Sequence, residues 1–270
     1  MPILNKDMTL CISLAARPSN IGTRFHNYLY EQLGLNFIYK AFAPADLAQA
    51  VAGIRGLPIR GAAVSMPYKE DVIDLVDRMD PSAAAIDSVN TIVNDDGVLT
   101  AYNTDYLAIA RLLADHEVSP AGSVLLRGSG GMAKAVAAAL RDAGFGDVTI
   151  VARNEGTGRA LADLYGFNWI PEPGDATADL LINVTPLGMA GADEDIQSYE
   201  NETIAAAQTV FDVVALPSET PLIRAARAAG KKVITGAEVI AIQAEEQFVL
   251  YTGVRPTPEQ VREASEFSRS

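Results

Sequence analysis

The chain has 270 residues, of which 49% are hydrophobic and 20% charged, and this composition is typical of a globular protein rather than a disordered or fibrous one. Asp and Glu number 34 against 21 Lys and Arg, a formal net charge of -13, which opposes the phosphate attraction that nucleic-acid binding requires. Cys11 is the one cysteine and there are two histidines, so we expect neither an intramolecular disulfide nor a metal site of the usual His or Cys spacing.

The length divided by a typical domain of roughly 150 residues predicts two domains. Residues 1–7 lack the basic patch and apolar stretch of a signal peptide, and no apolar run approaches the roughly 18 residues of a membrane-spanning helix. We therefore expect a soluble cytoplasmic protein without nucleic-acid or membrane partners. Monomer and homodimer both remain open.

Short apolar runs alternate with amphipathic segments over the first hundred residues, which predicts an α/β domain with a mainly parallel sheet. The Asp-Gly pair in Asn94-Asp95-Asp96-Gly97 is typical of a tight hairpin turn. The predicted strands are 10–14, 37–41 and 62–66 with the hairpin, and the predicted helices are 24–33, 46–54, 69–76 and 104–114.

A second series of elements follows Pro120 and has the pattern of a doubly wound nucleotide-binding domain. Two further helices, 237–250 and 258–267, end the chain without another strand and could pack on the first domain. The predicted strands of the series are 124–126, 148–152, 180–184, 210–214 and 232–235, and its predicted helices include 132–143 and 221–229.

A glycine cluster, Gly128-Ser129-Gly130-Gly131, lies between a predicted strand and a predicted helix. Bare backbone there lets a pyrophosphate approach the helix N-terminus, although the spacing is GxGG and a tight turn is the alternative interpretation. The next strand ends at Arg153 with no acidic residue to bind a ribose diol. An arginine at this position favours NADP over NAD, because its guanidinium can pair with the 2'-phosphate that only NADP carries. Arg159 could assist or be a surface charge.

Three polar clusters follow the strands of the first domain: 65–69, 88–91 and 102–105. Each has a simpler explanation as a helix cap, a turn or a surface charge. Taken together, their Ser, Lys, Asn and Asp side chains suit a small hydroxylated acid, because Lys with Asp could form an acid/base pair.

These clusters, the glycine loop, the segments 183–189 and 243–248, and Tyr251-Thr252-Gly253 resemble, in order, the motifs of the shikimate dehydrogenase family. Arg17-Pro18-Ser19-Asn20 and Ala152-Arg153-Asn154 make the resemblance closest to its shikimate dehydrogenase-like branch. The resemblance covers nearly the whole chain and implies an NADP-dependent oxidoreductase of the shikimate pathway of aromatic amino acid biosynthesis.

The resemblance implies a substrate-binding α/β domain, 1–105, completed by 237–270, and a Rossmann-like NADP domain, 106–236. It implies reversible reduction of 3-dehydroshikimate to shikimate, with Lys69 and Asp105 as the catalytic pair. Ser65, Asn90 and Gln243 are the implied substrate contacts. The implied dinucleotide contacts are Gly128, Ser129, Gly130, Gly131, Met132, Arg153, Val213 and Gly236.

Two departures from the family pattern put the identity of the substrate in doubt. Asn20 and Gly22 replace a Ser-x-Ser pair, so Ser19, Asn20 and Thr23 are the expected partners of a ring carboxylate. Ala215 replaces a common tyrosine. The alternatives are an NAD(P)-dependent dehydrogenase of quinate or another cyclic polyol acid, and a non-catalytic sensor of NADP or a metabolite.

Overall fold

The computed structural model describes residues 4–269, and the chain divides into two compact units. Unit 1 comprises Met1–Thr104 and Ala241–Ser270, and unit 2 comprises Asp105–Ile240. The domain boundaries expected from the sequence lie within four residues of this division. Each unit is described by itself below.

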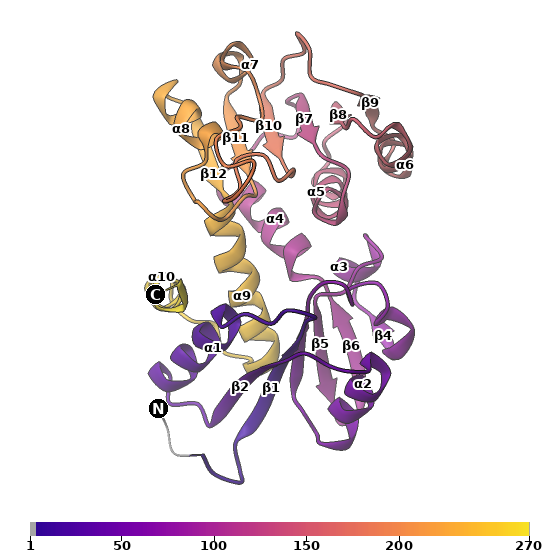
Figure 1. The fold of residues 1–270 in the computed structure, drawn as a ribbon, viewed down its shortest axis with the longest axis vertical. Helices are drawn as coiled ribbons and strands as arrows, with labels where there is room; N and C mark the ends of the chain where they lie inside the picture. Colours follow the sequence, from indigo (N-terminus) through magenta and orange to yellow (C-terminus); the bar gives the residue numbers. More distant parts are fainter. Residues whose placement is uncertain (1–3, 270) are drawn as a thin grey trace. The chain divides into compact units, whose positions relative to one another are not determined.

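Unit 1 is built on a six-stranded sheet of order β2-β1-β3-β5-β6-β4 (Figure 1). Strand β1 pairs in parallel with β2 and β3, as does β4 with β6, whereas β5 runs antiparallel to β3 and β6. The sheet is therefore mixed, with three of its five pairings parallel. The strands are β1 (Thr9–Leu14), β2 (Phe37–Phe42), β3 (Gly61–Val64), β4 (Arg78–Met79), β5 (Thr91–Asp95) and β6 (Val98–Tyr102).

The hairpin expected at residues 94–97 is confirmed. Asp96 and Gly97 both have positive φ angles, 52° and 91°, as the favoured two-residue hairpin turn requires. The Asn94 side chain fixes the turn, since its Oδ1 accepts from the Gly97 N–H (2.7 Å) while its Nδ2 donates to the Ile54 carbonyl (2.9 Å). Asn94 thus joins the hairpin to helix α2 (Leu47–Gly56), which contains Ile54.

The helix predicted over 69–76 is wrong, because the structure has only a short 3-10 turn at Ile73–Leu75 there. The Lys69 carbonyl accepts a hydrogen bond from the Val89 N–H (2.8 Å) instead of from a helical partner. Long-range pairing therefore overrides the local helical pattern. The helices of unit 1 are α1 (Ile21–Gln32), α2 (Leu47–Gly56), α3 (Pro81–Ala84), the part of α9 (Gly236–Thr252) from Ala241 onward, and α10 (Pro258–Arg269).

An aromatic cluster packs α1, α9 and the sheet of unit 1 together. His26 lies at its centre, stacked on Tyr39 with ring centroids 4.4 Å apart, and burial lowers the pKa of His26 to about 3 despite an opposing contribution from Gln247. The imidazole is therefore neutral, which suits its position among aromatic rings. A Cβ at Gly61 would lie 2.2 Å from the Tyr251 ring, so only glycine fits beneath this cluster.

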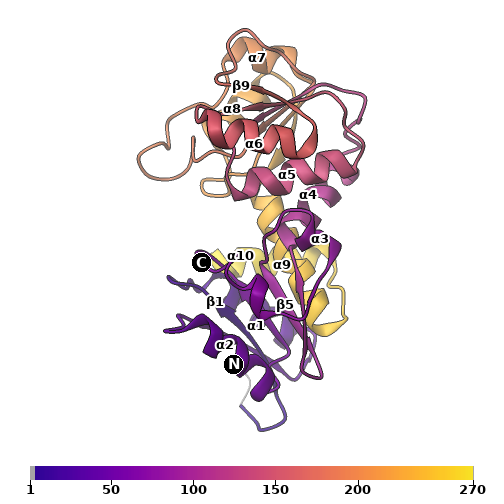
Figure 2. The ribbon, with the colours of Figure 1, turned by 90° about the vertical axis from the view of Figure 1, so that its right-hand side faces the viewer.

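Unit 2 contains a six-stranded parallel sheet of order β12-β11-β10-β7-β8-β9. This is the strand order of a doubly wound dinucleotide-binding fold, which confirms the predicted fold class. Helices α5 and α6 lie on one side of the sheet and α8 on the other (Figures 1 and 2). The strands are β7 (Val124–Arg127), β8 (Val148–Val151), β9 (Asn168–Ile170), β10 (Leu180–Asn183), β11 (Thr209–Asp212) and β12 (Lys232–Thr235), and the helices are α4 (Thr104–Asp115), α5 (Gly131–Asp142), α6 (Glu155–Tyr165), α7 (Asn201–Ala206) and α8 (Pro221–Ala228).

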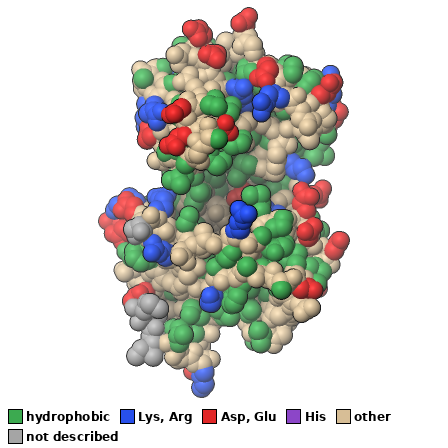
Figure 3. Space-filling view, viewed as in Figure 1, with side chains coloured by type: hydrophobic (Ala, Val, Ile, Leu, Met, Phe, Trp, Pro, Cys, Tyr) green, Lys and Arg blue, Asp and Glu red, His purple; other side chains and the backbone are tan. Residues whose placement is uncertain are grey.

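The charged side chains are interspersed on the face seen in Figure 3, where Lys and Arg lie among Asp and Glu. Between residues 4 and 269, no helix is both long and apolar enough to cross a membrane.

Candidate active site

Backbone hydrogen bonds bring three predicted site residues of unit 1 to one edge of its sheet. The Ser65 N–H donates to the Leu14 carbonyl (2.9 Å), and the Val64 N–H donates to the Asn90 carbonyl (2.8 Å). Lys69 joins the same edge through its carbonyl, which accepts from Val89 next to Asn90 (2.8 Å). Ser65 is exposed, Lys69 half-buried and Asn90 buried.

The Asn90 side chain has a fixed orientation. Its Oδ1 accepts from the Thr104 N–H (2.8 Å), the Thr91 hydroxyl (2.9 Å) and the Thr104 hydroxyl (3.2 Å). Because a backbone N–H can only donate, the atom facing it must be the oxygen, which settles the amide assignment.

The other end of the Asn90 amide is a buried donor without an acceptor. Nδ2 is inaccessible to solvent and has no hydrogen-bond partner among the residues that the structure describes. A buried donor left unsatisfied costs about 1–3 kcal/mol. An acceptor atom supplied by a ligand would remove this cost.

The predicted carboxylate contacts lie at the beginning of α1. Ser19 and Asn20 are exposed, and Asn20 occupies the N-cap position without making a side-chain capping bond. Thr23 Oγ1 is buried and has no partner within the described range 4–269. The chain just before this segment pairs with the residues that follow Ser65, because the Ala16 N–H donates to the Met66 carbonyl (3.3 Å). Hydroxyl and amide groups are therefore present where a carboxylate contact is expected.

Gln243 lies half-buried on α9, one turn before Gln247. Gln247 is buried and its Nε2 donates to the Asn90 carbonyl (3.3 Å) and to Thr91 Oγ1 (3.0 Å). Residues four apart share a helix face, so Gln243 lies on the face of α9 from which Gln247 reaches Asn90. Sequence reasoning identified Gln243 and missed Gln247 and Thr91.

Asp105 is the second residue of α4 and follows Thr104, which Asn90 holds. A carboxylate in the first turn of a helix is favoured by the helix dipole. Asn103, the residue before Thr104, is also fixed, because its Nδ2 donates to the Ser88 carbonyl (2.9 Å). The backbone leading to Asp105 is therefore well anchored, and the roles of Lys69 and Asp105 belong to the proposal below.

In unit 2 the glycine loop between β7 and α5 contains two kinds of glycine. Gly128 has a φ of +128°, and a Cβ there would lie 2.6 Å from Val184 Cγ2, so the fold itself requires this glycine. A Cβ at Gly130 or Gly131 would meet nothing within 4 Å. These two glycines leave open space at the N-terminus of α5, where unpaired amides favour a phosphate.

The end of β8 lies beside this loop. Ser129 Oγ and Thr157 Oγ1 are hydrogen-bonded at 2.8 Å, and Asn154 Oδ1 accepts from the Thr157 N–H (3.1 Å) to cap α6. Arg153, just before Asn154, is exposed. Arg159 is engaged elsewhere, because its Nε bonds Glu155 (2.8 Å) and its guanidinium lies 4.4 Å from the Trp169 ring centroid. Arg153 is thus the better placed candidate for a 2'-phosphate.

The other predicted dinucleotide contacts of unit 2 lie at the carboxyl ends of its strands or at the start of α5. Met132 is half-buried in the first turn of α5, and Val213 is half-buried after β11. Gly236 lies against the backbone, since a Cβ there would be 2.4 Å from the Val213 carbonyl oxygen. Close backbone packing explains this glycine without a cofactor, and its cofactor contact stays a prediction.

A buried carboxyl group organises the loop after β11. Asp212 accepts from Thr220 Oγ1 (2.6 Å), the Val214 N–H (3.1 Å) and Asn183 Nδ2 (3.0 Å). Burial raises the pKa of Asp212 above its ordinary value, although these three hydrogen bonds oppose the shift. The carboxyl group therefore holds its proton more strongly in the folded chain.

This shift predicts a specific pH dependence of stability. A raised folded-state pKa stabilises the fold fully below the unfolded pKa, and that contribution is lost as the pH rises through the folded pKa. Relative to the Asp212→Asn variant, the wild-type free energy of unfolding should therefore fall as the pH rises from about 4. Urea unfolding of both proteins across this range measures the difference, and a difference that grows with pH would contradict the assignment.

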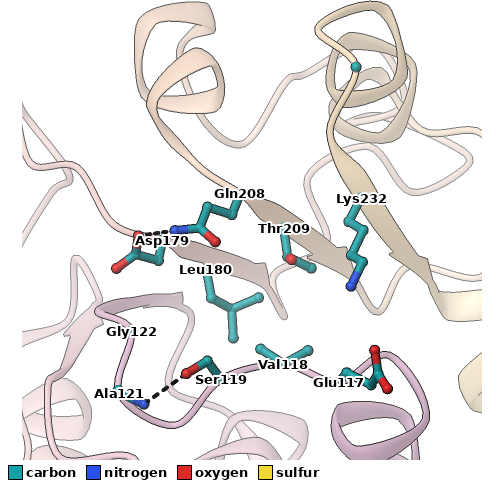
Figure 4. A pocket seen from close by; sticks show the side chains of 11 residues that line it. Glu117, Val118, Ser119, Ala121, Gly122, Asp179, Leu180, Gln208, Thr209 and Lys232 are labelled. Carbon is teal, nitrogen blue, oxygen red and sulfur yellow. Dashed lines mark hydrogen bonds between the residues drawn. The ribbon is translucent and has the colours of Figure 1, made fainter.

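A cavity in unit 2, lined by both polar and apolar residues, lies away from these residues. It has a volume of about 620 Å³ and is formed at the amino ends of β10, β11 and β12 (Figure 4). Two of its polar groups already have protein partners: Gln208 Nε2 donates to Asp179 (2.8 Å), and Lys232 Nζ donates to the His116 carbonyl (3.1 Å). The glycine loop lies at the opposite, carboxyl end of the strands, which is where open α/β sheets bind ligands.

Comparison with known proteins agrees with this layout. A family profile described as "Shikimate dehydrogenase substrate binding domain" matches residues 20–92. A shikimate dehydrogenase-like protein of Haemophilus influenzae is 53% identical over 269 residues, which cover 99% of both chains.

Two solved structures share the fold over nearly the whole chain. Shikimate 5-dehydrogenase of Thermus thermophilus, solved in complex with NADP(H) and shikimate, is 30% identical with a TM-score of 0.85, and the match covers 97% of this chain and 100% of that one. Quinate dehydrogenase of Corynebacterium glutamicum, solved in complex with NAD, is 26% identical with a TM-score of 0.87, covering 96% and 98%. The chain therefore belongs to the shikimate dehydrogenase family.

Proposed function

We propose that this chain is an NADP-dependent dehydrogenase that interconverts shikimate and 3-dehydroshikimate. The observation that carries the proposal is the buried Nδ2 donor of Asn90, for which the described residues offer no acceptor. A ring hydroxyl oxygen is a suitable acceptor. Membership of the family and the Thermus relative's complex with shikimate and NADP(H) support the same substrate and cofactor.

Lys69 and Asp105 are the proposed catalytic pair. Oxidation of a secondary alcohol removes a hydride from carbon and a proton from oxygen, and NADP, when bound, supplies the hydride acceptor. The Lys69 amine takes the hydroxyl proton in this direction and returns it to the ketone oxygen in the other. The Asp105 carboxylate orients the Lys69 side chain and hydrogen-bonds a neighbouring ring hydroxyl.

Ser65, Asn90 and Gln243 bind ring hydroxyls in this proposal. Ser19, Asn20 and Thr23 bind the ring carboxylate through hydroxyl and amide donors, and the buried Thr23 Oγ1 without a described partner fits that role. Catalysis thus depends mainly on positioning the ring so that its alcohol meets Lys69.

The dinucleotide fits the open space at Gly130 and Gly131, with its pyrophosphate at the N-terminus of α5. Ser129, Met132, Val213 and Gly236 complete the proposed binding groups together with Gly128. Arg153 binds the 2'-phosphate, which makes NADP the preferred cofactor and leaves NAD as a weaker one.

Replacing Arg153 by Ala should reduce the preference for NADP over NAD about tenfold, because a charge-assisted bond to the 2'-phosphate is lost. The measurement is the ratio of kcat/KM for the two cofactors. Arg159→Ala is the matched control, since Arg159 is already engaged by Glu155 and Trp169. An unchanged ratio in Arg153→Ala would remove Arg153 from the phosphate site.

Quinate is the second candidate substrate. The replacement of the family Ser-x-Ser pair by Asn20 and Gly22, and of a tyrosine by Ala215, changes the expected surroundings of the ring, and a quinate dehydrogenase shares the fold. Initial rates of nicotinamide reduction with NADP or NAD, each with shikimate or quinate, separate the two candidates. The highest kcat/KM with NADP and shikimate is expected; turnover of quinate alone would replace shikimate as the substrate, and no turnover of either would overturn the proposed reaction.

A further inference from the structure

Two buried side chains, those of Gln247 and Thr91, form hydrogen bonds that hold Asn90. Gln247 of α9 donates through Nε2 to the Asn90 carbonyl (3.3 Å) and to Thr91 Oγ1 (3.0 Å). Thr91 Oγ1 in turn lies 2.9 Å from Asn90 Oδ1. Gln247, Thr91 and Asn90 are 5%, 0% and 3% exposed, so water does not compete for these bonds.

The donor and acceptor of each hydrogen bond between Gln247, Thr91 and Asn90 can be assigned. Asn90 Oδ1 is an acceptor because it faces the Thr104 N–H (2.8 Å). The single hydroxyl proton of Thr91 must therefore be donated to Asn90 Oδ1, which leaves Thr91 Oγ1 as an acceptor for Gln247 Nε2. The bonds thus pass from Gln247 through Thr91 to Asn90, and they leave Nδ2 as the free donor at the end.

Two residues hold Asn90 Oδ1: Thr104 through its N–H and its hydroxyl, and Thr91 through its hydroxyl. Thr104 determines which atom of the amide is the oxygen, and it does so from the backbone. Thr91 holds the same oxygen from a second direction and is itself held by a residue 156 positions away in the sequence. The Thr91 hydroxyl is thus a third donor beside the two of Thr104, and each added donor further restricts the rotation of the amide.

We propose that Gln247 and Thr91 are positioning residues that hold the Asn90 amide with Nδ2 directed at a substrate oxygen. Neither side chain touches the substrate in this account; both act through Asn90. The inference rests on the proposed function, since it assumes that Asn90 binds the substrate.

The kinetic test uses Thr91→Val, which keeps the side-chain shape and removes the hydroxyl, and Gln247→Leu. Each should raise the KM for shikimate roughly fivefold, as expected for one hydrogen bond, with kcat and the KM for NADP nearly unchanged. Thr91→Ser should restore the wild-type KM. Thr100→Val, on the neighbouring strand β6, is the matched control and should not change any of the three constants.

A second measurement does not depend on turnover. Nuclear magnetic resonance relaxation of the Asn90 side-chain NH2 group, assigned by its disappearance in Asn90→Ala, reports the rigidity of the amide. The amide should be rigid in the wild type and Thr100→Val and mobile in Thr91→Val and Gln247→Leu. An equally rigid amide in both variants would overturn the positioning role, whatever the substrate is.

The Asn90→Ala variant separates failure of the inference from failure of the proposed function. If Asn90→Ala leaves the KM for shikimate unchanged, Asn90 does not bind the substrate and both proposals fail at that residue. If Asn90→Ala raises the KM while Thr91→Val and Gln247→Leu do not, the proposed function survives and the positioning role is wrong.

Discussion

Replacement of Lys69 by Met should lower kcat about 1,000-fold, because general acid–base catalysis by a positioned side chain contributes roughly 10²- to 10⁴-fold. Methionine keeps the length of the side chain and removes the proton-transfer group. The affinity for NADP should not change, since the proposed cofactor groups lie in unit 2 and Lys69 lies in unit 1. Steady-state kinetics together with a cofactor titration measure both quantities.

Lys40→Met is the matched control for this experiment. Lys40 is exposed on β2, where its Nζ lies 5.2 Å from the Phe42 ring centroid, and it takes no part in the proposed site. Full activity in Lys69→Met would remove Lys69 from the chemistry. A parallel loss of cofactor affinity would indicate a general disturbance of the protein instead of a lost proton-transfer group.

Gly236→Ala should destabilise the fold by about 3 kcal/mol, because its Cβ would be 2.4 Å from backbone atoms of Val213 and Val214 and overpacked sites relax poorly. Backbone atoms cannot move aside as the end of a flexible side chain can. Urea unfolding monitored by circular dichroism measures the change in the free energy of unfolding.

Gly131→Ala is the contrasting variant. A Cβ at Gly131 meets nothing within 4 Å, and alanine is the better helix former, so the stability should be kept or slightly raised. The affinity for NADP should fall, since the methyl group occupies the space proposed for the pyrophosphate. Equal stability of Gly236→Ala and wild type would show that the backbone at Gly236 adjusts, and unchanged NADP affinity in Gly131→Ala would place the pyrophosphate elsewhere.

Local chemistry predicted several elements well. The Asp-Gly turn identified the hairpin of β5 and β6, and short apolar runs identified five of the six strands of unit 2, all except β9. The sequence did not predict α6, which contains Gly156 and Gly158, because glycine disfavours a helix. The structure supplies the reason for Gly158: its Cβ would lie 2.2 Å from Trp169 Nε1 of β9, and this contact joins parts of the chain that no local pattern relates.

The helix predicted at residues 69–76 is absent for the same reason, a contact with a distant part of the sequence. The apolar spacing there is helical, but the Lys69 carbonyl pairs with Val89, twenty residues away in sequence. The other elements that were missed, β4, α3, β9 and α7, have between two and six residues. Segments this short carry too few residues for a periodic pattern to be distinguished.

Motif resemblance identified Ser65, Lys69 and Asn90, and the structure brings all three to one sheet edge. It did not identify Thr91 and Gln247, because their importance depends on hydrogen bonds between residues 156 and 157 positions apart. A second glutamine one turn after Gln243 was the available signal. Amphipathic spacing alone does not reveal which buried amide it will meet.

The most direct test of the account is calorimetric titration of shikimate into the wild type and Asn90→Ala, each saturated with NADPH. Shikimate and reduced cofactor form a complex that does not react, so the heat reports binding alone. We expect measurable binding to the wild type and at least tenfold weaker binding to Asn90→Ala, since the variant lacks the amide that is proposed to donate to a substrate oxygen. Equal affinity of the two proteins would contradict the claim that the Asn90 donor receives the substrate.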